Sequence, residues 1–334
     1  MKKIKVIGAS MVALLGAVAL ASCGSKDKNT FEVGVLQYVT HNALNSATEG
    51  FKKALTDKCP EGKKVNFTIK NPEADASSLL TMANQLVRNS DLVMGNATPA
   101  ATQLISSAAT EGKNLPILFT SVTDPVGAGL VSANSGANHK ENVTGTSDMN
   151  PIDQQAEMVF DFDSSVDKIG IIYNISETNS KTQCDAFEAY IKAHHAGCAV
   201  VTRTVSEQTQ ISSTVTKLVE DGIDALYVPT DNLLAANVST ITNVTNPAKI
   251  PVYGGEGGLV DSGATMSLSI SYYELGYTTG LQAAEILFEG KLAKDIDVVS
   301  QTDTSKMEFV YSKEAMTAMG LTFPEAFKTK YGVK

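Results

Sequence analysis

The chain has 334 residues, of which 43% are hydrophobic and 19% charged, and its formal net charge is −9. This length suits two domains, and the balance of residue types is sufficient to bury a core. The acidic charge argues against a nucleic-acid partner, because binding to a phosphate backbone needs a basic surface.

The start of the chain, residues 1–23, differs from the rest. A basic start, MKKIK, precedes a run of uncharged and mostly apolar residues, 6–21, and then LASCG at 20–24. This layout is typical of a secretory signal peptide and resembles the signal of bacterial lipoproteins. We therefore expect a signal peptide over residues 1–22, a lipid on Cys23 and a tether over residues 23–30. A plain cleaved signal and an uncleaved anchor are the alternatives, although a spanning helix needs ~20 apolar residues.

A lipid on Cys23 would place the protein on a membrane surface rather than across the membrane. We expect an exported protein, anchored to the bacterial cell membrane and facing the periplasm or the cell exterior. The cysteines that follow Cys23 are Cys59, Cys184 and Cys198. Cys184 and Cys198 flank an expected helix whose ends would lie about 20 Å apart, which is too far for a disulfide. We therefore expect free, buried thiols.

Apolar strand-like runs alternate with helical patterns from residue 31 onward. Strands are expected at 32–37, 65–70, 91–95, 116–120, 168–173, 199–204, 225–228 and 250–253. Helices are expected at 43–55, 76–88, 100–110, 180–194, 211–221 and 233–243. Such alternation indicates parallel βαβ units, and the continuous apolar strands indicate helices on both faces of each sheet.

Eight such units predict an α/β fold of two Rossmann-like lobes, each with a parallel sheet of about four strands, joined by a hinge. A (β/α)₈ barrel also has eight units. The irregular segment at 122–142 favours the two lobes, because it suits a first crossing between them. We expect the N-terminal lobe to contain residues 31–146 and 254–289, and the C-terminal lobe residues 147–253 and 290–334.

Two segments that are far apart in the chain share one pattern. DLVMGNATPAATQLI at 91–105 and DALYVPTDNLLAANVSTI at 224–241 each pass from an apolar strand through a turn with proline to an alanine-rich helix. Ligands of open parallel sheets bind at the carboxyl ends of strands, where the next helix presents unpaired N–H groups. Thr98 is expected to cap one such helix, with Pro99 as its first residue. Ordinary capping would explain either turn alone, whereas the pair indicates a ligand cleft between lobes.

The turns that follow the strands contain three acids, Asp124, Asp231 and Glu256. The same turns contain no Arg or Lys before Lys181. A zwitterionic α-amino acid fits this set, because helix N-termini and hydroxyls bind its carboxylate and acids bind its ammonium. Each acid is also explained as a solvated turn residue or a helix cap. Aromatic residues that could line an apolar ligand side chain are Tyr38, Phe119, Tyr173, Tyr227 and Tyr253.

Enzyme motifs are absent from the sequence, which contains no G-x-S-x-G, no H-E-x-x-H and no complete G-x-G-x-x-G. The absence of a C-x-x-C pair leaves a metal site of that kind without support. His41 is the one histidine in an expected site turn, where a hydrolase could use it or Asp124. We expect a monomeric binding protein rather than an enzyme, with no cofactor and no metal.

Several sequence motifs resemble those of the TrpX-like substrate-binding lipoproteins of ABC importers. These motifs are GVLQYVTHNAL, NATPAATQLI, PILFTSVTDPVGAGLV, NVTGTSD, YNISETNS, YVPTDN and YYELGYTTG. The resemblance covers nearly all of residues 31–327. It implies a type I periplasmic-binding-protein-like fold whose lobes close on the ligand. It also implies delivery of tryptophan, tyrosine, phenylalanine or a related compound to a membrane permease.

The matched motifs and the acids of the turns together give the expected ligand-binding residues. They are Thr40, His41, Asn96, Ala97, Thr98, Ala100, Thr123, Asp124, Ser176, Glu177, Asn179, Ser180, Asp231 and Glu256. We expect the ligand carboxylate at Thr98 and near residues 176–180, and its ammonium at Asp231, together with Glu256. Glu256 lies in the segment Gly255-Glu256-Gly257, where many members of the family have a short acidic segment of different sequence. A nucleoside, another amphiphilic solute and a role as a ligand sensor domain remain the alternatives.

Overall fold

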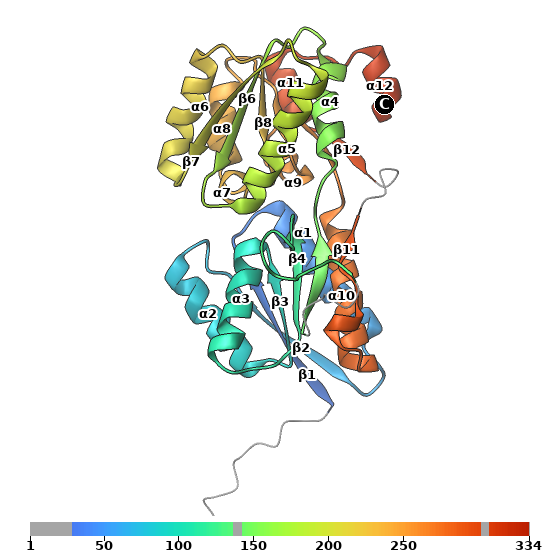
Figure 1. Ribbon diagram of the computed structural model, residues 1–334. Helices are drawn as coiled ribbons and strands as arrows, with labels where there is room; N and C mark the ends of the chain where they lie inside the picture. The colour runs from blue at the N-terminus through green and yellow to red at the C-terminus, as the bar shows by residue number, and fades with distance from the viewer. Residues whose placement is uncertain (1–28, 136–141, 302–306, 334) are drawn as a thin grey trace, which may run out of the picture.

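The computed structural model describes residues 29–135, 142–301 and 307–333. The expected signal peptide, Cys23 and nearly all of the tether lie outside these residues. Within them, no helix is long and apolar enough to span a bilayer. The described residues form two lobes, one above the other in Figure 1, and each lobe contains a six-stranded sheet.

The first lobe has an all-parallel sheet in the order β11-β5-β4-β3-β1-β2. The strands are β1 (Thr30–Gln37), β2 (Lys64–Lys70), β3 (Leu92–Asn96), β4 (Ile117–Val122), β5 (Val143–Ser147) and β11 (Val299–Ser300). One face is covered by α1 (Asn42–Lys58) and α10 (Tyr272–Glu289). The other face is covered by α2 (Ala76–Asn89) and α3 (Thr98–Thr110). A single 3₁₀ turn, η3 (Ala293–Asp295), precedes β11.

The second lobe repeats this plan in the order β12-β10-β9-β8-β6-β7, with β12 antiparallel at the edge. Its strands are β6 (Lys168–Asn174), β7 (Ala199–Val205), β8 (Ala225–Val228), β9 (Val252–Gly254), β10 (Met266–Ser269) and β12 (Glu308–Tyr311). One face packs against α4 (Ile152–Phe162), α5 (Thr178–His194), α11 (Lys313–Met319) and α12 (Glu325–Tyr331). The other packs against α6 (Ile211–Glu220), α7 (Asn232–Ala235), α8 (Val238–Thr245) and α9 (Gly257–Asp261), and the exposed turn η2 (Gln208–Gln210) precedes α6.

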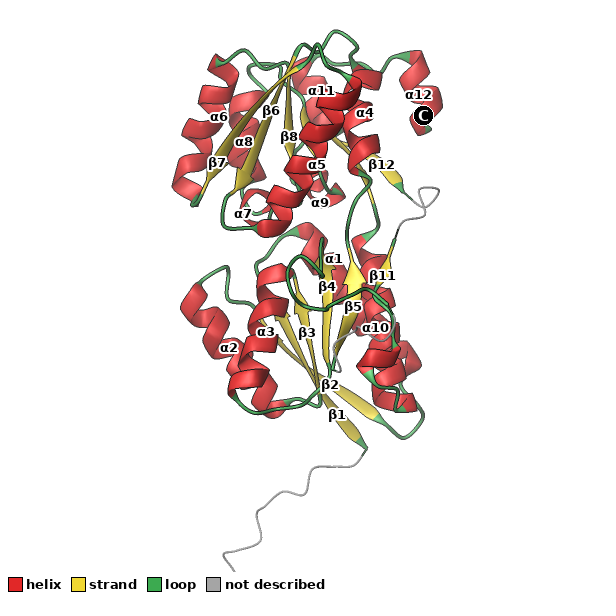
Figure 2. Cartoon of the chain, viewed as in Figure 1, coloured by secondary structure: helices red, strands yellow, loops and turns green. Residues whose placement is uncertain are grey.

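The central strands explain why the sheets are parallel and covered on both sides. Every residue of β3, β4 and β8 is buried. A strand buried on both faces needs helices above and below it, and βαβ crossovers supply them. Figure 2 shows the resulting layers, with helices on both sides of each sheet.

The two-lobed α/β architecture is confirmed, and the (β/α)₈ barrel is wrong because the described strands form two separate sheets. Each sheet has six strands rather than four. The additional strands are β5, β10, β11 and β12, which have two to five residues and include polar sequences such as VTGTS and MSLS. The helix expected at 233–243 is interrupted at residues 236–237, which separates α7 from α8.

The chain passes between lobes after β5, after β10 and after β11 (Figure 1). The first crossing was expected at 122–142, but Leu130 and Val131 in that segment are buried in the first lobe. Residues 254–269 belong to the second lobe, because β10 pairs with β9 and β12. Residues 299–300 belong to the first lobe, because β11 pairs with β5. The expected boundaries at 254–289 and 290–334 are corrected accordingly.

The described cysteines are free, as expected. Cys184 is buried, whereas Cys59 and Cys198 are only partly buried, which differs from the expectation for these two. Among the described residues, therefore, neither lobe is held by a disulfide, and the hydrophobic cores stabilise the fold.

The packing of α1 against α10 depends on two glycines. A Cβ atom on Gly276 of α10 would overlap the carbonyl oxygen of Ala47 in α1, and one on Gly50 would overlap that of Tyr273. Backbone atoms meet backbone atoms here, so no side chain can move aside. The close packing of α1 and α10 fixes the N-terminal ends of both helices, and these ends lie at the cleft.

Replacing Gly276 with Ala tests this close approach. Alanine favours a helix interior by about 1 kcal/mol over glycine, but the overlap with Ala47 should outweigh this gain. We expect a net loss of about 1–3 kcal/mol in unfolding free energy, measured by chemical denaturation. Gly197→Ala is the control, because nothing lies within 4 Å of the added atom. Equal stability of the two variants would contradict the packing described.

Candidate functional site

A small cavity lies between the lobes, at the carboxyl ends of strands from both sheets. It is lined by His41, Leu44, Ser121, Asp148, Asn179, Thr230, Asp231, Asn232, Glu256 and Tyr272. An open groove adjoins the cavity at Asn179. The groove is lined by Thr98, Pro99, Thr102, Gln103, Ser106, Ser176, Glu177, Thr178 and Asn179.

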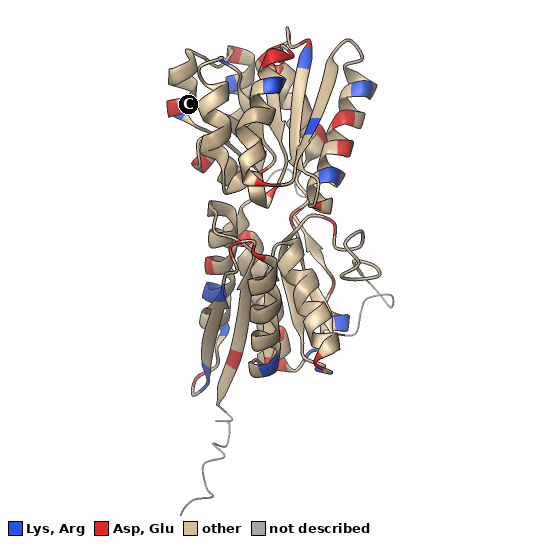
Figure 3. Cartoon of the chain, turned by 90° about the vertical axis from the view of Figure 1, so that its left-hand side faces the viewer, with Lys and Arg blue, Asp and Glu red and all other residues tan. Residues whose placement is uncertain are grey.

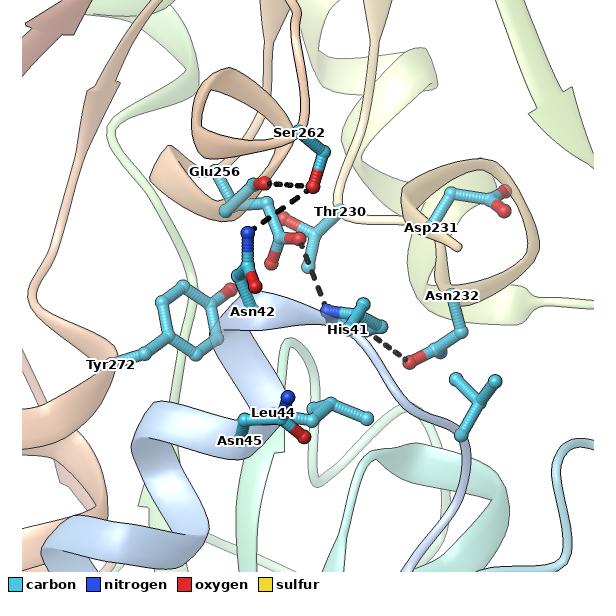
Figure 4. A network of polar contacts seen from close by, with 12 residues as sticks. His41, Asn42, Leu44, Asn45, Thr230, Asp231, Asn232, Glu256, Ser262 and Tyr272 are labelled. Carbon is cyan, nitrogen blue, oxygen red and sulfur yellow. Dashed lines mark hydrogen bonds and ion pairs between the residues drawn. The ribbon is translucent and has the colours of Figure 1, made fainter. Parts of the chain in front are cut away.

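The two lobes touch across this cavity. His41 Nε2 lies 3.4 Å from Asn232 Oδ1, and Asn42 Nδ2 donates to Ser262 Oγ at 3.3 Å (Figure 4). A Cβ atom on Gly258 of α9 would lie 2.9 Å from the backbone nitrogen of Ala43 in α1. The structure is therefore a closed form, and glycine at 258 permits the approach.

His41 comes from the turn after β1 and precedes α1. It is buried, and its Nδ1 has no hydrogen-bond partner. The Nδ1 atom lies 3.8 Å from Glu256 Oε1, which is too long for a hydrogen bond. Burial lowers the pKa of His41 to about 4, so the imidazole is neutral at physiological pH and brings no positive charge to the cavity.

Glu256 comes from the turn after β9 and precedes α9. Its side chain is fully buried, and neither carboxyl oxygen has a hydrogen-bond partner. In Figure 4 it extends from the second lobe toward His41 in the first. Burial and then the nearby Asp148 raise the pKa of Glu256 to about 8, although the neighbouring Tyr272 hydroxyl acts in the opposite direction. An unpaired carboxyl of this kind costs free energy unless a ligand or a proton satisfies it.

Asp231 and Glu177 are also buried, but their oxygens are occupied. Asp231 accepts the backbone N–H of Asn174 at 2.6 Å and that of Leu234 at 3.0 Å. Glu177 accepts from Asn232 through the backbone N–H at 3.1 Å and the side-chain amide at 2.6 Å. Figure 4 shows the Asp231 carboxyl turned into its own helix, away from His41. Burial raises the pKa of both acids.

Asp148 and Tyr272 line the cavity at two of the crossings between lobes. The Tyr272 hydroxyl donates to Asp148 Oδ2 at 2.7 Å, and burial raises the pKa of Asp148. Neither residue was expected at the site. Both occur in the motifs NVTGTSD and YYELGYTTG, so the sequence contained a signal for them. Tyr272 is the first residue of α10.

Ser121 also lines the cavity and was not expected there. Its backbone has a φ of 55°, and its buried hydroxyl has no partner. A positive φ is rare for a residue with a side chain, and such strained positions cluster at ligand sites.

The groove lies between the N-termini of α3 and α5. Neither helix has an acidic residue in its first turn, and neither has a side-chain cap. The expected cap, Thr98, is already the first helical residue, and Ala97 with a φ of 87° takes the cap position. Thr98 therefore does not bond its own helix end, and the free N–H groups and positive dipole end of α3 favour an anion in the groove. At the start of α5 the dipole is the same, but the acidic Glu177 takes the cap position.

Several expected site residues lie outside the cavity and the groove. Thr40 is exposed and donates to Glu73, and Asp124 accepts the N–H of Gly127 within a turn. Asn96 is fully buried and donates to the carbonyl oxygen of Leu44. Ala97 and Ala100 are buried among hydrophobic side chains. Ser180 is buried behind the cavity wall, where it donates to the carbonyl of residue 230.

The expected residues that border the cavity or the groove are His41, Thr98, Ser176, Glu177, Asn179, Asp231 and Glu256. Thr123 lies at the junction of the lobes, where Gln183 Nε2 is 3.4 Å from its hydroxyl. Asn232 and Thr230, which belong to the motif YVPTDN but not to the expected ligand-binding residues, also line the cavity.

The aromatic side chains expected around the ligand lie mostly in the cores. Phe119, Tyr227 and Tyr253 are fully buried, and Tyr173 belongs to the core of the second lobe. Tyr38 differs, because it is only half-buried and its pKa is raised by burial and by Glu177 and Asp231 of the other lobe. Tyr38 therefore faces the cleft.

Positive side chains are missing from the lining of the described cavity and groove. Lys181, in the first turns of α5, is exposed and forms an ion pair with Asp185 at 2.5 Å. Figure 3 shows acidic positions at the facing ends of both lobes. The site therefore suits a ligand that carries a positive charge.

Comparisons with known proteins agree with this geometry. The family model described as "ABC transporter substrate binding protein" matches residues 32–331. The tyrosine-binding protein of Clostridioides difficile (strain R20291) is 34% identical over 345 residues, covering 99% of this chain and 96% of that protein. The chain belongs to the ABC transporter substrate-binding protein family. Proteins of this family bind a small molecule outside the cytoplasm and deliver it to an ABC permease.

Two solved structures are similar to this substrate-binding protein. The ABC domain from Streptococcus pneumonia in complex with L-Trp has a TM-score of 0.79 and 36% identity, covering 90% of this chain and 99% of that one. The ligand-free, open structure of a substrate-binding protein with adhesive properties from Clostridium difficile has a TM-score of 0.66 and 32% identity, covering 88% and 96%. The resemblance to ABC importer proteins found in the sequence is confirmed.

Replacing Gly258 with Leu should hold the substrate-binding protein open, because the side chain would enter the space of Ala43 when the lobes close. Small-angle scattering in the presence of L-tyrosine or L-tryptophan should give a larger radius of gyration than the parent protein. Gly197→Leu is the matched control at a glycine with open space around it. A compact Gly258→Leu variant would show that α1 and α9 do not meet on closure.

Proposed function

We propose that this substrate-binding protein captures an α-amino acid with an aromatic side chain, such as tyrosine or tryptophan, and delivers it to an ABC permease. The names of two relatives, 34% and 36% identical to this chain, support this ligand class, since one is a tyrosine-binding protein and the other was solved with L-Trp. The observation that carries the proposal is the buried Glu256 carboxyl, which has no partner in the closed cleft.

In this proposal the ligand ammonium binds Glu256. Asp231, the first choice from the sequence, already accepts two backbone N–H groups and stabilises the start of α7. The free oxygens of Glu256, with the unpartnered hydroxyl of Ser121 and amide oxygen of Asn179, offer an ammonium three kinds of acceptor. An ammonium donates three hydrogen bonds, so this set matches its chemistry.

The ligand carboxylate extends toward the groove in our proposal. The N-termini of α3 and α5 supply N–H groups and positive dipole ends there. Thr98 and Thr178 add hydroxyl groups at the same place. The ligand then contacts both lobes at once, and such a ligand favours the closed state over the open one. Tyr38 supplies an aromatic face for the ligand side chain.

We propose capture without chemical turnover. His41, the one histidine of the cavity, is near Asn232 and Glu256 and has no Ser or Cys nucleophile among its hydrogen-bond partners. Asp124, the other candidate for catalysis, is bonded in a turn with Gly127. The proposed form at the membrane is a monomer attached through a lipid on Cys23.

Mass spectrometry of small molecules released from the purified, denatured protein tests the ligand class. We expect an aromatic amino acid, confirmed by calorimetric titration of the ligand-free protein with L-tyrosine, L-tryptophan and L-phenylalanine. Release of a nucleoside or a sugar, with no heat on titration with these amino acids, would overturn the proposal.

Glu256→Gln should weaken binding of the amino acid at pH 8. A hydrogen bond to a charged group contributes about 1.5–3 kcal/mol, so the dissociation constant should rise roughly 10- to 150-fold. Glu49→Gln is the matched control, because it removes the same charge from an exposed position of α1. An unchanged titration for Glu256→Gln would place the ammonium elsewhere.

The lipid anchor makes a separate prediction about the mature N-terminus. Mass spectrometry of the protein purified from bacterial membranes should find Cys23 as its first residue, carrying an acyl-glycerol group. The Cys23→Ala variant should lack both the lipid and the cleavage before residue 23. A parent chain that begins at another residue, without lipid, would support a plain secretory signal instead.

A further inference from the structure

The closed cleft buries four carboxyl groups around one small cavity. The titratable groups that face Glu256 are His41 at the start of α1, Asp148 after β5, Glu177 before α5, Asp231 before α7 and Tyr272 at the start of α10. None of them supplies a positive charge, because burial keeps His41 neutral. An ionised Glu256 therefore has no counter-charge when the lobes close without a ligand.

The other three carboxyls have partners within the protein. Glu177 accepts from Asn232, Asp231 accepts two backbone N–H groups, and Asp148 accepts from Tyr272 through Oδ2 while its Oδ1 has no partner. Glu256 has none. Its environment also depends on both lobes, since His41 and Tyr272 belong to the first lobe and Glu256 to the second. Opening the cleft therefore exposes Glu256 to water, and closing it removes that water.

The sign of the pH effect follows from this change in hydration. In the open cleft the pKa of Glu256 should lie near its ordinary value of about 4.3, and in the closed cleft it is raised to about 8. A higher pKa in the closed form means that closure takes up a proton between these two pH values. Closure of the ligand-free protein therefore weakens as pH rises through that window, by up to about tenfold per pH unit for one proton.

We propose that Glu256 makes closure of the cleft conditional on a positive charge, so that the lobes close on a ligand ammonium or on a proton, and close without a ligand less readily as the pH rises toward 8. This inference rests on the proposed function and adds a selection rule to it. An amino acid is accepted because its ammonium replaces the proton. A ligand of the same shape without an ammonium binds weakly. The closed form that the permease recognises is therefore formed mainly when ligand is bound.

The hydroxy acids that correspond to the aromatic amino acids test this rule, because a hydroxyl replaces the ammonium at the same position. We expect wild-type protein at pH 8 to bind L-tyrosine or L-tryptophan but to bind 3-(4-hydroxyphenyl)lactate and indole-3-lactate far more weakly. Lowering the pH from 8 to 6 should improve hydroxy-acid binding by at least about tenfold, since a proton then replaces the missing charge. Amino-acid binding should change much less.

The Glu256→Gln variant should reverse the preference. Its neutral amide needs no positive charge, so hydroxy-acid binding at pH 8 should improve over wild type while amino-acid binding weakens. Glu49→Gln should behave as wild type in both titrations. Hydroxy-acid affinities that are independent of pH and equal in the wild type and Glu256→Gln would overturn the inference, even if amino acids bind normally.

A measurement without ligand separates this inference from the proposed ligand class. Small-angle scattering of the ligand-free protein should give a large radius of gyration at pH 8 and a smaller one as the pH falls toward 5.5. Glu256→Gln should be more compact than wild type at pH 8 and should depend less on pH. If no aromatic amino acid binds, the proposed ligand fails, but this series still decides the inference. A radius that is independent of pH and equal in both proteins would contradict it.

Discussion

The cleft of this substrate-binding protein is organised around one unpaired charge. Glu256 is fully buried between the lobes, with no hydrogen-bond partner and no cation beside it among the described residues. Burying a carboxylate in this way is unfavourable unless a counter-charge or a proton is present. Glu177 and Asp231 are bonded to protein groups through both oxygens, and Asp148 has one free oxygen, so Glu256 is the acid with both oxygens available to a ligand. In our proposal, closure of the lobes and selection of a positively charged ligand both depend on how the Glu256 carboxyl is neutralised.

The fold brings that carboxyl to the cleft through ordinary α/β topology. Parallel sheets with helices on both faces direct the carboxyl ends of their strands to one edge, and the two lobes place these edges opposite each other. The turns after β1 and β9 then carry His41 and Glu256 to the same cavity, although the two residues are far apart in the sequence. The same topology brings the N-termini of α3 and α5 to the adjoining groove, so one site has a place for a cation and a place for an anion.

The sequence predicted the lobes well because most of their strands are apolar and regularly spaced. It failed at β5 and β10, since VTGTS and MSLS are rich in polar residues and are strands because neighbouring strands pair with them. At the site, the sequence identified acids in turns but not which oxygens are free. Asp231 and Glu256 look alike in sequence, and only the backbone N–H groups of Asn174 and Leu234 distinguish them. Asp148 was missed because it follows a strand that the pattern did not predict.

A crystal structure of the protein with a bound aromatic amino acid would test the central claim most directly. The account predicts a closed cleft in which the ligand nitrogen lies about 2.7–3.2 Å from a carboxyl oxygen of Glu256, with the ligand carboxylate directed to the start of α3 or α5. A ligand whose nitrogen contacts other acids while Glu256 bonds only to water or protein would contradict it.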